Sequence, residues 1–226
     1  FESSREHYPE PEKVLLTGTP VREEFLFAKR QEARQALGLG EEPLVVSCWG
    51  SLGAREMNKK IAQFMKCECE ENTPFHHIHA TGSFGWRWMP EYVKELGVDL
   101  AAHPRIDMRE YIYDMPQVLA AADLIVCRAG AATIAEVCAS GTPCIMVPSP
   151  NVTGNHQEKN ARVLERSGAA AVVREADCDG KSLYETAKAI LSDAGRMRAM
   201  RASARDMAVV DAAERIYQTA LDLAKH

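Results

Sequence analysis

The sequence lacks any apolar run long enough to cross a bilayer, and it lacks an excess of positive charge. Stretches such as Leu124–Cys127 and Cys144–Pro148 fall far short of the roughly 20 apolar residues that a transmembrane helix needs. The formal net charge of −5 gives no general attraction to nucleic acid or to anionic lipid. We therefore expect no direct membrane insertion and no nucleic-acid partner.

A recognisable metal site is also lacking. The pairs Cys67/Cys69 and His76/His77, with His79 close by, do not reproduce the usual C-x₂₋₄-C and H-x₃₋₅-H spacing of zinc ligands. Four of the seven cysteines lie within apolar runs, as is typical of reduced, buried thiols. These patterns predict a cytoplasmic protein without a bound metal or cofactor.

Short β-rich apolar runs alternate with longer segments of helical period. The strand candidates are Val14–Thr17, Leu44–Cys48, His76–Ala80, Leu124–Cys127, Cys144–Val147 and Ala170–Val173. Helices are expected at 22–37, 54–69, 115–122, 131–140, 155–167 and, as a tail, 182–225. This alternation predicts an α/β fold, a doubly wound parallel sheet with helices on both faces and a helical tail.

A first glycine-rich motif, Gly50-Ser51-Leu52-Gly53, directly follows the expected strand Leu44–Cys48 and opens a helix. Glycines there let backbone amides approach an anion, and the helix N-terminus offers unpaired N–H groups. Ordinary turn chemistry between strand and helix fits the same residues. Arg55 stands where the dinucleotide fingerprint G-x-G-x-x-G has its third glycine, so that fingerprint is absent.

A second motif runs from Arg128 to Glu136, again at the exit of a strand and the entry of a helix. Thr133 and Glu136 share a helix face because they are three residues apart. A carboxylate there could accept both hydroxyls of a ribose. Equally, Thr133 and Glu136 could form a capping box, and the spacing does not decide between the two.

Two further segments follow strand candidates. The loop 148–155 leads to His156, Gln157 and Asn160, whose polar groups suit sugar hydroxyls but also suit a solvated loop with an Asn N-cap. Arg22 begins a helix after Gly18-Thr19-Pro20, where a guanidinium can clamp a phosphate or remain a surface charge. Since ligands bind outside the carboxyl ends of parallel strands, these motifs should converge on one rim.

Taken together, the segments 18–22, 50–55, 111–115, 121–136 and 156–160 resemble, in order and spacing, the motif series of the C-terminal domain of the MurG family, in glycosyltransferase family 28. The resemblance implies a Rossmann-like domain that forms the C-terminal half of a GT-B fold. It also implies binding of UDP-GlcNAc by an inverting transferase of peptidoglycan (cell-wall) biosynthesis, which converts lipid I to lipid II at the inner face of the plasma membrane.

The same resemblance assigns roles residue by residue. The donor-binding residues that it implies are Arg22 and Ser51 at the diphosphate, Ile112 at uracil through its backbone, Glu136 at the ribose, Ala132 and Thr133 beside the diphosphate and sugar, and His156, Gln157 and Asn160 at the GlcNAc hydroxyls. Gly50 and Gly53 would form the phosphate loop. No metal is expected, because backbone amides and an arginine can stabilise the departing UDP.

The chain departs from the family pattern at several points. Trp49 stands where the family usually has the first glycine of G-G-S, so its bulk either restricts the phosphate loop or packs outside it. Thr19 replaces the usual asparagine of G-N-P-V-R, and His156 replaces a glutamine of some relatives. The acceptor-binding N-terminal half and its general base are expected outside these 226 residues, so no catalytic residue is expected within them.

The resulting organisation is a linker at 1–13, a UDP-GlcNAc-binding domain at 14–208 and a C-terminal helix at 209–226. Three alternatives stay open at this stage. The chain could be a UDP-sugar-binding subunit that has lost catalysis, one chain of a split enzyme, or half of a related GT-B enzyme with another sugar specificity, such as a UDP-sugar 2-epimerase-like or diacylglycerol glucosyltransferase-like protein. The acceptor is a lipid-linked sugar only by resemblance.

Overall fold

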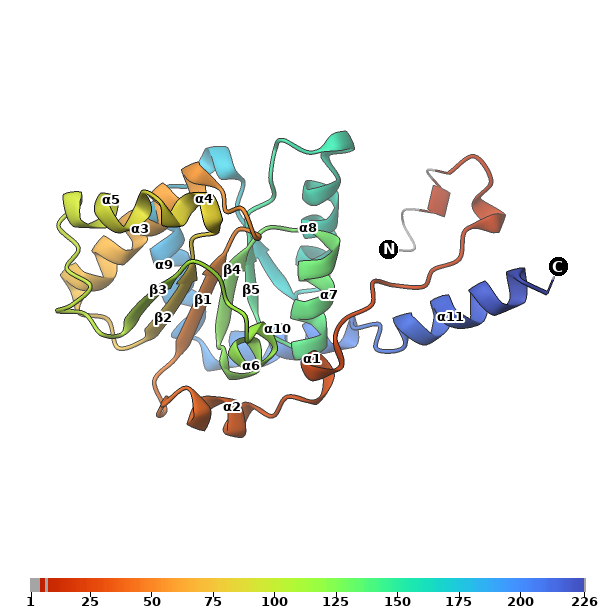
Figure 1. Cartoon of the computed structure of the whole chain (residues 1–226), viewed down its shortest axis with the longest axis horizontal. Helices are drawn as coiled ribbons and strands as arrows, with labels where there is room; N and C mark the ends of the chain where they lie inside the picture. Colours follow the sequence, from red (N-terminus) through yellow and green to blue (C-terminus); the bar gives the residue numbers. More distant parts are fainter. Residues whose placement is uncertain (1–4, 7, 226) are drawn as a thin grey trace.

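The computed structural model describes residues 5–6 and 8–225. At its centre is a six-stranded parallel sheet of order β3-β2-β1-β4-β5-β6 (Figure 1). The strands are β1 Leu44–Cys48, β2 His76–Ala80, β3 Ile106–Arg109, β4 Leu124–Cys127, β5 Cys144–Met146 and β6 Ala170–Val172. The chain runs outward in both directions from the central pair β1 and β4, so their carboxyl ends form the switch point of a doubly wound sheet.

Helices cover both faces of the sheet, as the alternation of strands and helices predicts. One core contains Val46 and Ile125 and is covered by α1 Glu23–Phe27, α2 Arg30–Ala36, α6 Met115–Ala121, α7 Ala131–Ser140 and α8 His156–Arg166. The other contains Val45 and Leu124 and is covered by α3 Arg55–Glu71, α5 Met89–Glu95 and α9 Gly180–Leu191. Neighbouring strand residues enter opposite cores because side chains alternate along a strand.

The remaining elements lie at the edges of this body. They are α4 Ser83–Trp86, α10 Ala194–Asp206, α11 Ala212–Leu223 and the 3₁₀ turns η2 Pro11–Lys13, η3 Thr153–Asn155 and η4 Glu175–Asp177. α10 bridges the two cores, since Met200 joins one and Ala204 the other. The predicted helical tail consists of three helices, α9, α10 and α11. The N-caps of α9 and α10 are Asp179 and Asp193, whose carboxylates accept from backbone amides of the first turn.

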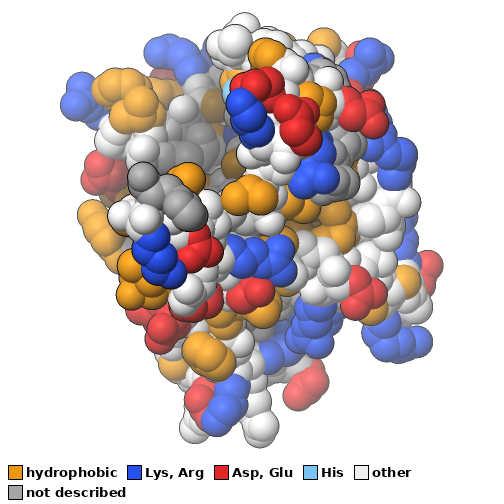
Figure 2. Space-filling view, turned by 90° about the vertical axis from the view of Figure 1, so that its right-hand side faces the viewer, with side chains coloured by type: hydrophobic (Ala, Val, Ile, Leu, Met, Phe, Trp, Pro, Cys, Tyr) orange, Lys and Arg blue, Asp and Glu red, His pale blue; other side chains and the backbone are white. Residues whose placement is uncertain are grey.

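α11 and the segment 8–18 extend away from the sheet side by side (Figure 1). Both carry exposed large apolar side chains: Tyr8, Leu15 and Leu16 on the segment, and Ile216, Tyr217, Leu221 and Leu223 on the helix. Figure 2 views the molecule from this side and shows apolar side chains interspersed with charged ones. The predicted linker 1–13 falls partly on residues 1–4 and 7, which lie outside the described part of the chain.

Two strand predictions need correction. Val14–Thr17 is extended chain and pairs with no strand, because Leu15 and Leu16 point into solvent instead of into either core. The sixth strand is Ile106–Arg109, which pairs with β2 at the edge of the sheet. Only Ile106 of this strand is buried, so its sequence carries too weak an apolar signal to be found by pattern.

Candidate functional site

A cleft of about 470 Å³ opens where β1, β2 and β4 end, on the side of the sheet covered by α6 and α7. We call it the strand-end cleft. Its lining includes six of the residues that the sequence singles out: Arg22, Gly50, Ser51, Ile112, Thr133 and Glu136. They come from four segments distant in sequence. The parallel topology brings three of these segments together because β1, β3 and β4 end at the same edge, and Arg22 joins them as the N-cap of α1.

The loop after β1 depends on its glycines. Gly50 and Gly53 have φ values of +85° and +78°, a left-handed region that side chains rarely adopt. A Cβ at Gly53 would lie 2.0 Å from the carbonyl oxygen of Thr81, and Asn58 Nδ2 fixes that oxygen by a 2.7 Å hydrogen bond. The loop is thus pressed against the chain after β2, with Gly50 and Ser51 left facing the cleft.

Glu136 lies half-buried in the strand-end cleft. It is the sixth residue of α7, whose N-cap is Gly130, and no side chain caps that N-terminus. The capping-box interpretation is therefore wrong, because Glu136 lies too far along the helix to reach the first amides. Burial raises the pKa of Glu136, and the nearby Arg22 opposes that rise. The uncapped first turn of α7 leaves amide N–H groups available to an anion.

Trp49 packs outside the loop. Its side chain is buried in the core beneath α3 and α9, whereas its neighbour Cys48 lines the strand-end cleft. Strand alternation explains the difference, since adjacent side chains point to opposite faces. Burial and the neighbouring Glu136 raise the pKa of the Cys48 thiol to about 12, so this cysteine is a neutral part of the cleft wall.

Arg128 connects the segments that follow four strands, β1, β4, β5 and β6. Its guanidinium lies 5.7 Å from the centre of the Trp49 ring. It also pairs with Glu175 at 2.6 Å and donates to the carbonyl of Val147 at 3.0 Å. Both charged side chains are mostly buried. This cluster therefore fixes Trp49, and with it the start of the glycine loop, against the loops that follow β4, β5 and β6.

Replacing Arg128 with alanine should lower the free energy of unfolding by about 2–3 kcal/mol, because it strands the mostly buried Glu175 carboxylate and removes packing from Trp49. Chemical denaturation of both proteins measures the change. The matched control is Arg174→Ala, which breaks an exposed pair with Asp177 and should cost under about 1 kcal/mol. Equal losses in the two variants would contradict this account of the cluster.

The third predicted segment lies beside the strand-end cleft and does not line it. Gln157 Oε1 accepts from the amide of Ser149 at 2.9 Å, and His156, which is exposed, pairs through Nδ1 with the carbonyl of Thr153 at 3.0 Å. Asn160 donates to the carbonyl of Ala129 at 3.2 Å. In this structure the amides of Gln157 and Asn160 thus brace the loops before α8 and α7.

The other predicted residues lie near the same rim. Asn160 helps to line a separate cavity of about 310 Å³ together with Gly18 and Thr19. Ala132 is exposed on the first turn of α7. The sequence also suggested a solvated loop with an Asn N-cap. Asn155 does occupy the N-cap position of α8, but its side chain makes no capping hydrogen bond with the described residues.

Two tyrosines were not singled out by the sequence as cleft residues. Tyr111 and Tyr113 line the strand-end cleft, and their rings meet edge to face with centroids 4.9 Å apart. Both side chains are largely exposed. Their place follows from β3, which ends two residues earlier at Arg109. Because that strand gave no clear pattern, the position of the tyrosines at a strand end was missed.

Within the described ranges, no group of three or more histidine, cysteine or acidic side chains is placed to hold a metal ion. His77 and His79 are buried and share the hydroxyl of Ser47. No helix among the described residues has both the length and the apolar character needed to cross a membrane.

The glycosyltransferase family 28 C-terminal domain matches residues 44–216, most of the chain and all six strands. The chain belongs to this family. A crystal structure of MurG from Acinetobacter baumannii is 25% identical and superposes with a TM-score of 0.69, over 89% of this chain and 56% of that one. A structure of Anabaena HepE in complex with UDP and glucose, 16% identical with a TM-score of 0.60, shares the fold.

Curated relatives share one name, UDP-N-acetylglucosamine–N-acetylmuramyl-(pentapeptide) pyrophosphoryl-undecaprenol N-acetylglucosamine transferase. The protein from Acetivibrio thermocellus is 38% identical over 100% of this chain and 60% of its own length. That from Caldanaerobacter subterraneus is 41% identical over 96% of this chain and 59% of its own length. The family 28 chain thus spans about three fifths of these relatives.

Proposed function

We propose that this chain is the UDP-GlcNAc-binding half of an inverting GlcNAc transferase that acts on the lipid-linked peptidoglycan precursor, converting lipid I to lipid II. The observation that carries the proposal is the strand-end cleft, where the glycine loop, Arg22 and Glu136 converge at the switch point of the sheet. The names of relatives at 38% and 41% identity support the choice of donor.

In this proposal each part of the cleft takes one part of the donor. The carboxylate of Glu136 accepts both ribose hydroxyls, while the backbone of Ile112 meets uracil. Arg22, Ser51 and the loop of Gly50 and Gly53 surround the diphosphate, whose charge is shared by a guanidinium, amide N–H groups and the uncapped start of α7. Such preorganised donors stabilise the departing UDP without a metal.

The sugar would extend from the cleft toward the start of α8. Ala132 and Thr133 lie on the first turn of α7, and His156, Gln157 and Asn160 lie on the adjacent rim. To bind sugar hydroxyls, Gln157 and Asn160 would exchange the backbone contacts that they make in this structure. We propose that this exchange accompanies donor binding, because amide side chains can both donate and accept.

The nucleophile must approach the anomeric carbon from across the cleft. We propose that the lipid-linked acceptor and the general base are held by the part of the relatives that this chain does not span. We also propose that the whole protein acts in the cytoplasm, at the inner face of the plasma membrane. Positioning and base assistance account for many orders of magnitude in rate. The main argument for a subunit that has lost catalysis was that Trp49 restricts the phosphate loop. That argument fails because Trp49 packs away from the cleft.

The donor proposal predicts that the chain binds UDP and UDP-GlcNAc, weakly and without added divalent metal. Titration calorimetry with and without EDTA tests it. We expect the same affinity under both conditions, because protein groups alone surround the diphosphate. A strict requirement for metal, or no heat of binding at millimolar ligand, would rule the proposal out. Transfer assays with a lipid-linked acceptor and the complementary N-terminal region then test the reaction.

A further inference from the structure

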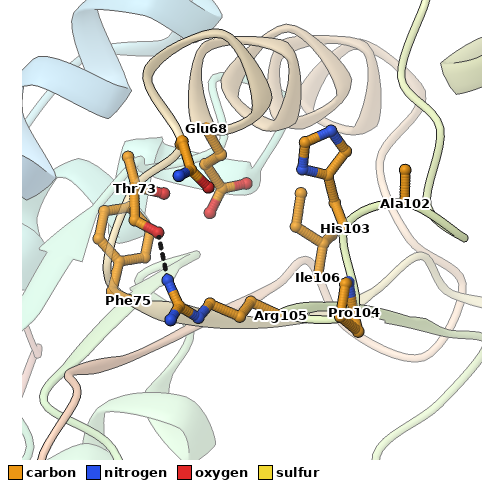
Figure 3. Close-up of a pocket in the computed structure, with 9 residues that line it drawn as sticks. Glu68, Thr73, Phe75, Ala102, His103, Pro104, Arg105 and Ile106 are labelled. Carbon is orange, nitrogen blue, oxygen red and sulfur yellow. Dashed lines mark hydrogen bonds between the residues drawn. The ribbon is translucent and has the colours of Figure 1, made fainter.

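Another pocket lies at the opposite end of the strands, where β2 and β3 begin. It encloses about 290 Å³ between the last turn of α3 and the chain segments that enter these strands. Figure 3 shows its lining: Glu68, Thr73, Phe75, His103, Arg105 and Ile106. None of these residues belongs to the strand-end cleft.

The floor of this pocket carries a buried carboxylate. The side chain of Glu68 is only 2% exposed, and its Oε2 lies 2.9 Å from His77 Nδ1. Its other oxygen, Oε1, has no hydrogen-bond partner among the described residues. Figure 3 shows the carboxylate directed into the pocket. An unpartnered buried carboxylate oxygen is costly, so a hydrogen-bond donor is missing at this position.

A chain of buried hydrogen bonds links His79, Ser47, His77 and Glu68. His79 Nδ1 lies 3.2 Å from the carbonyl of Ser47, which only accepts, so Nδ1 carries the hydrogen of a neutral ring. Burial lowers the pKa of His79 well below its ordinary value, consistent with that state. The same Nδ1 lies 2.7 Å from the Ser47 hydroxyl, whose own hydrogen is then free to point elsewhere.

That hydrogen goes to His77. The Ser47 hydroxyl lies 2.7 Å from His77 Nε2, which can accept that hydrogen and leave Nδ1 to donate. His77 Nδ1 then donates to Glu68 Oε2. In this arrangement no hydrogen-bond donor of the described residues reaches Glu68 Oε1.

The walls of the pocket have a different character from its floor. Arg105 lines one side and donates through Nη1 to the carbonyl of Thr73 at 3.1 Å; within the described ranges it forms no ion pair with Glu68. Phe75 and Ile106 are buried apolar residues, and His103 faces Glu68 across the space (Figure 3). The pocket thus combines a carboxyl group at its floor, a guanidinium at one side and an apolar wall.

We propose that this pocket binds a small zwitterion of the amino-acid class, with its ammonium group on Glu68, its carboxylate toward Arg105 and an apolar side chain against Phe75 and Ile106. An ammonium group supplies the hydrogen-bond donor that Glu68 Oε1 lacks. The guanidinium of Arg105 suits a carboxylate for the same reason. The inference does not depend on the identity of the ligand in the strand-end cleft.

Binding of L-leucine, followed by NMR or calorimetry on the full chain, tests the proposal. N-acetyl-L-leucine lacks the ammonium group, and L-leucinamide lacks the carboxylate. We expect L-leucine to bind in the millimolar range, N-acetyl-L-leucine to bind at least about tenfold more weakly, and L-leucinamide to lie between them, because hydrogen bonds to buried charges are the stronger ones.

Two variants locate the site. Glu68→Gln should weaken L-leucine binding at least about tenfold, whereas Glu70→Gln, an exposed residue of the same helix, should leave it unchanged. Arg105→Gln should remove the preference for L-leucine over L-leucinamide, and its exposed position lets it decide the matter if Glu68→Gln does not fold. UDP binding should be unaffected throughout. Binding that ignores Glu68 or Arg105, or no binding of L-leucine at all, would overturn the proposal.

Discussion

The variant Gly53→Ala should be the most destabilised single-site variant of the glycine loop, with a free energy of unfolding lower by about 2–5 kcal/mol. Two costs add up. A side chain at φ +78° costs about 1–2 kcal/mol. The new Cβ would also lie 2.0 Å from the carbonyl oxygen of Thr81, and the backbone must move to relieve that overlap, at a further cost of about 1–3 kcal/mol.

The matched control for this experiment is Gly97→Ala. Gly97 has a similar φ of +82°, but a Cβ there would meet nothing within 4 Å, so only the conformational cost of about 1–2 kcal/mol applies. Urea denaturation of both variants separates the two terms. If Gly53→Ala is no less stable than Gly97→Ala, the loop does not need the close approach to Thr81.

The same substitution should also weaken nucleotide binding if the strand-end cleft takes the donor. Thr81 cannot retreat freely, because Asn58 Nδ2 holds its carbonyl oxygen, so the loop must lift and carry Ser51 with it. Gly50→Ala is informative here, since a Cβ at Gly50 meets nothing within 4 Å and leaves the packing on Thr81 intact. We expect a smaller loss of UDP affinity for Gly50→Ala than for Gly53→Ala at equal folded fraction.

The sequence allowed the sheet to be predicted wherever strands are buried on both faces. β4 is buried along its whole length, and such strands appear as continuous apolar runs. The edge strand β3, Ile106–Arg109, escaped this test because it buries one residue of four. The prediction at Val14–Thr17 failed for the opposite reason. This run is apolar, but it lies beside no strand that could accept and donate its backbone hydrogen bonds.

The candidate site could be anticipated where its residues directly follow buried strands. Ser51 and Glu136 were placed after strands by pattern, and parallel topology alone brings strand ends together. Arg22 was placed after Val14–Thr17, which is not a strand, and it reaches the cleft as the N-cap of α1. The orientation of Trp49 depended on strand register, which local spacing leaves open. The pocket around Glu68 could not be predicted, because it joins chain segments whose chemistry is ordinary until the fold aligns His77, Ser47 and Glu68.

Removing the carboxylate of Glu136 should weaken UDP binding by about 1–3 kcal/mol, or roughly five- to 150-fold, the usual cost of losing charge-assisted hydrogen bonds. The physical reason is that the half-buried carboxylate can accept from two adjacent ribose hydroxyls at once, one through each oxygen. Glu136→Ala tests the loss by calorimetry, and Glu136→Gln, which keeps one acceptor oxygen, should lose less.

The stability of these variants distinguishes binding from a structural role. Burial raises the pKa of Glu136, so its charged form is disfavoured by folding and its removal should leave the protein as stable as before or slightly more stable. Glu185→Ala, on the exposed side of α9, serves as the control and should alter neither property. Inorganic pyrophosphate, which has no ribose, should bind wild type and Glu136→Ala alike. A large loss of stability with unchanged UDP affinity would instead make Glu136 a structural residue of α7.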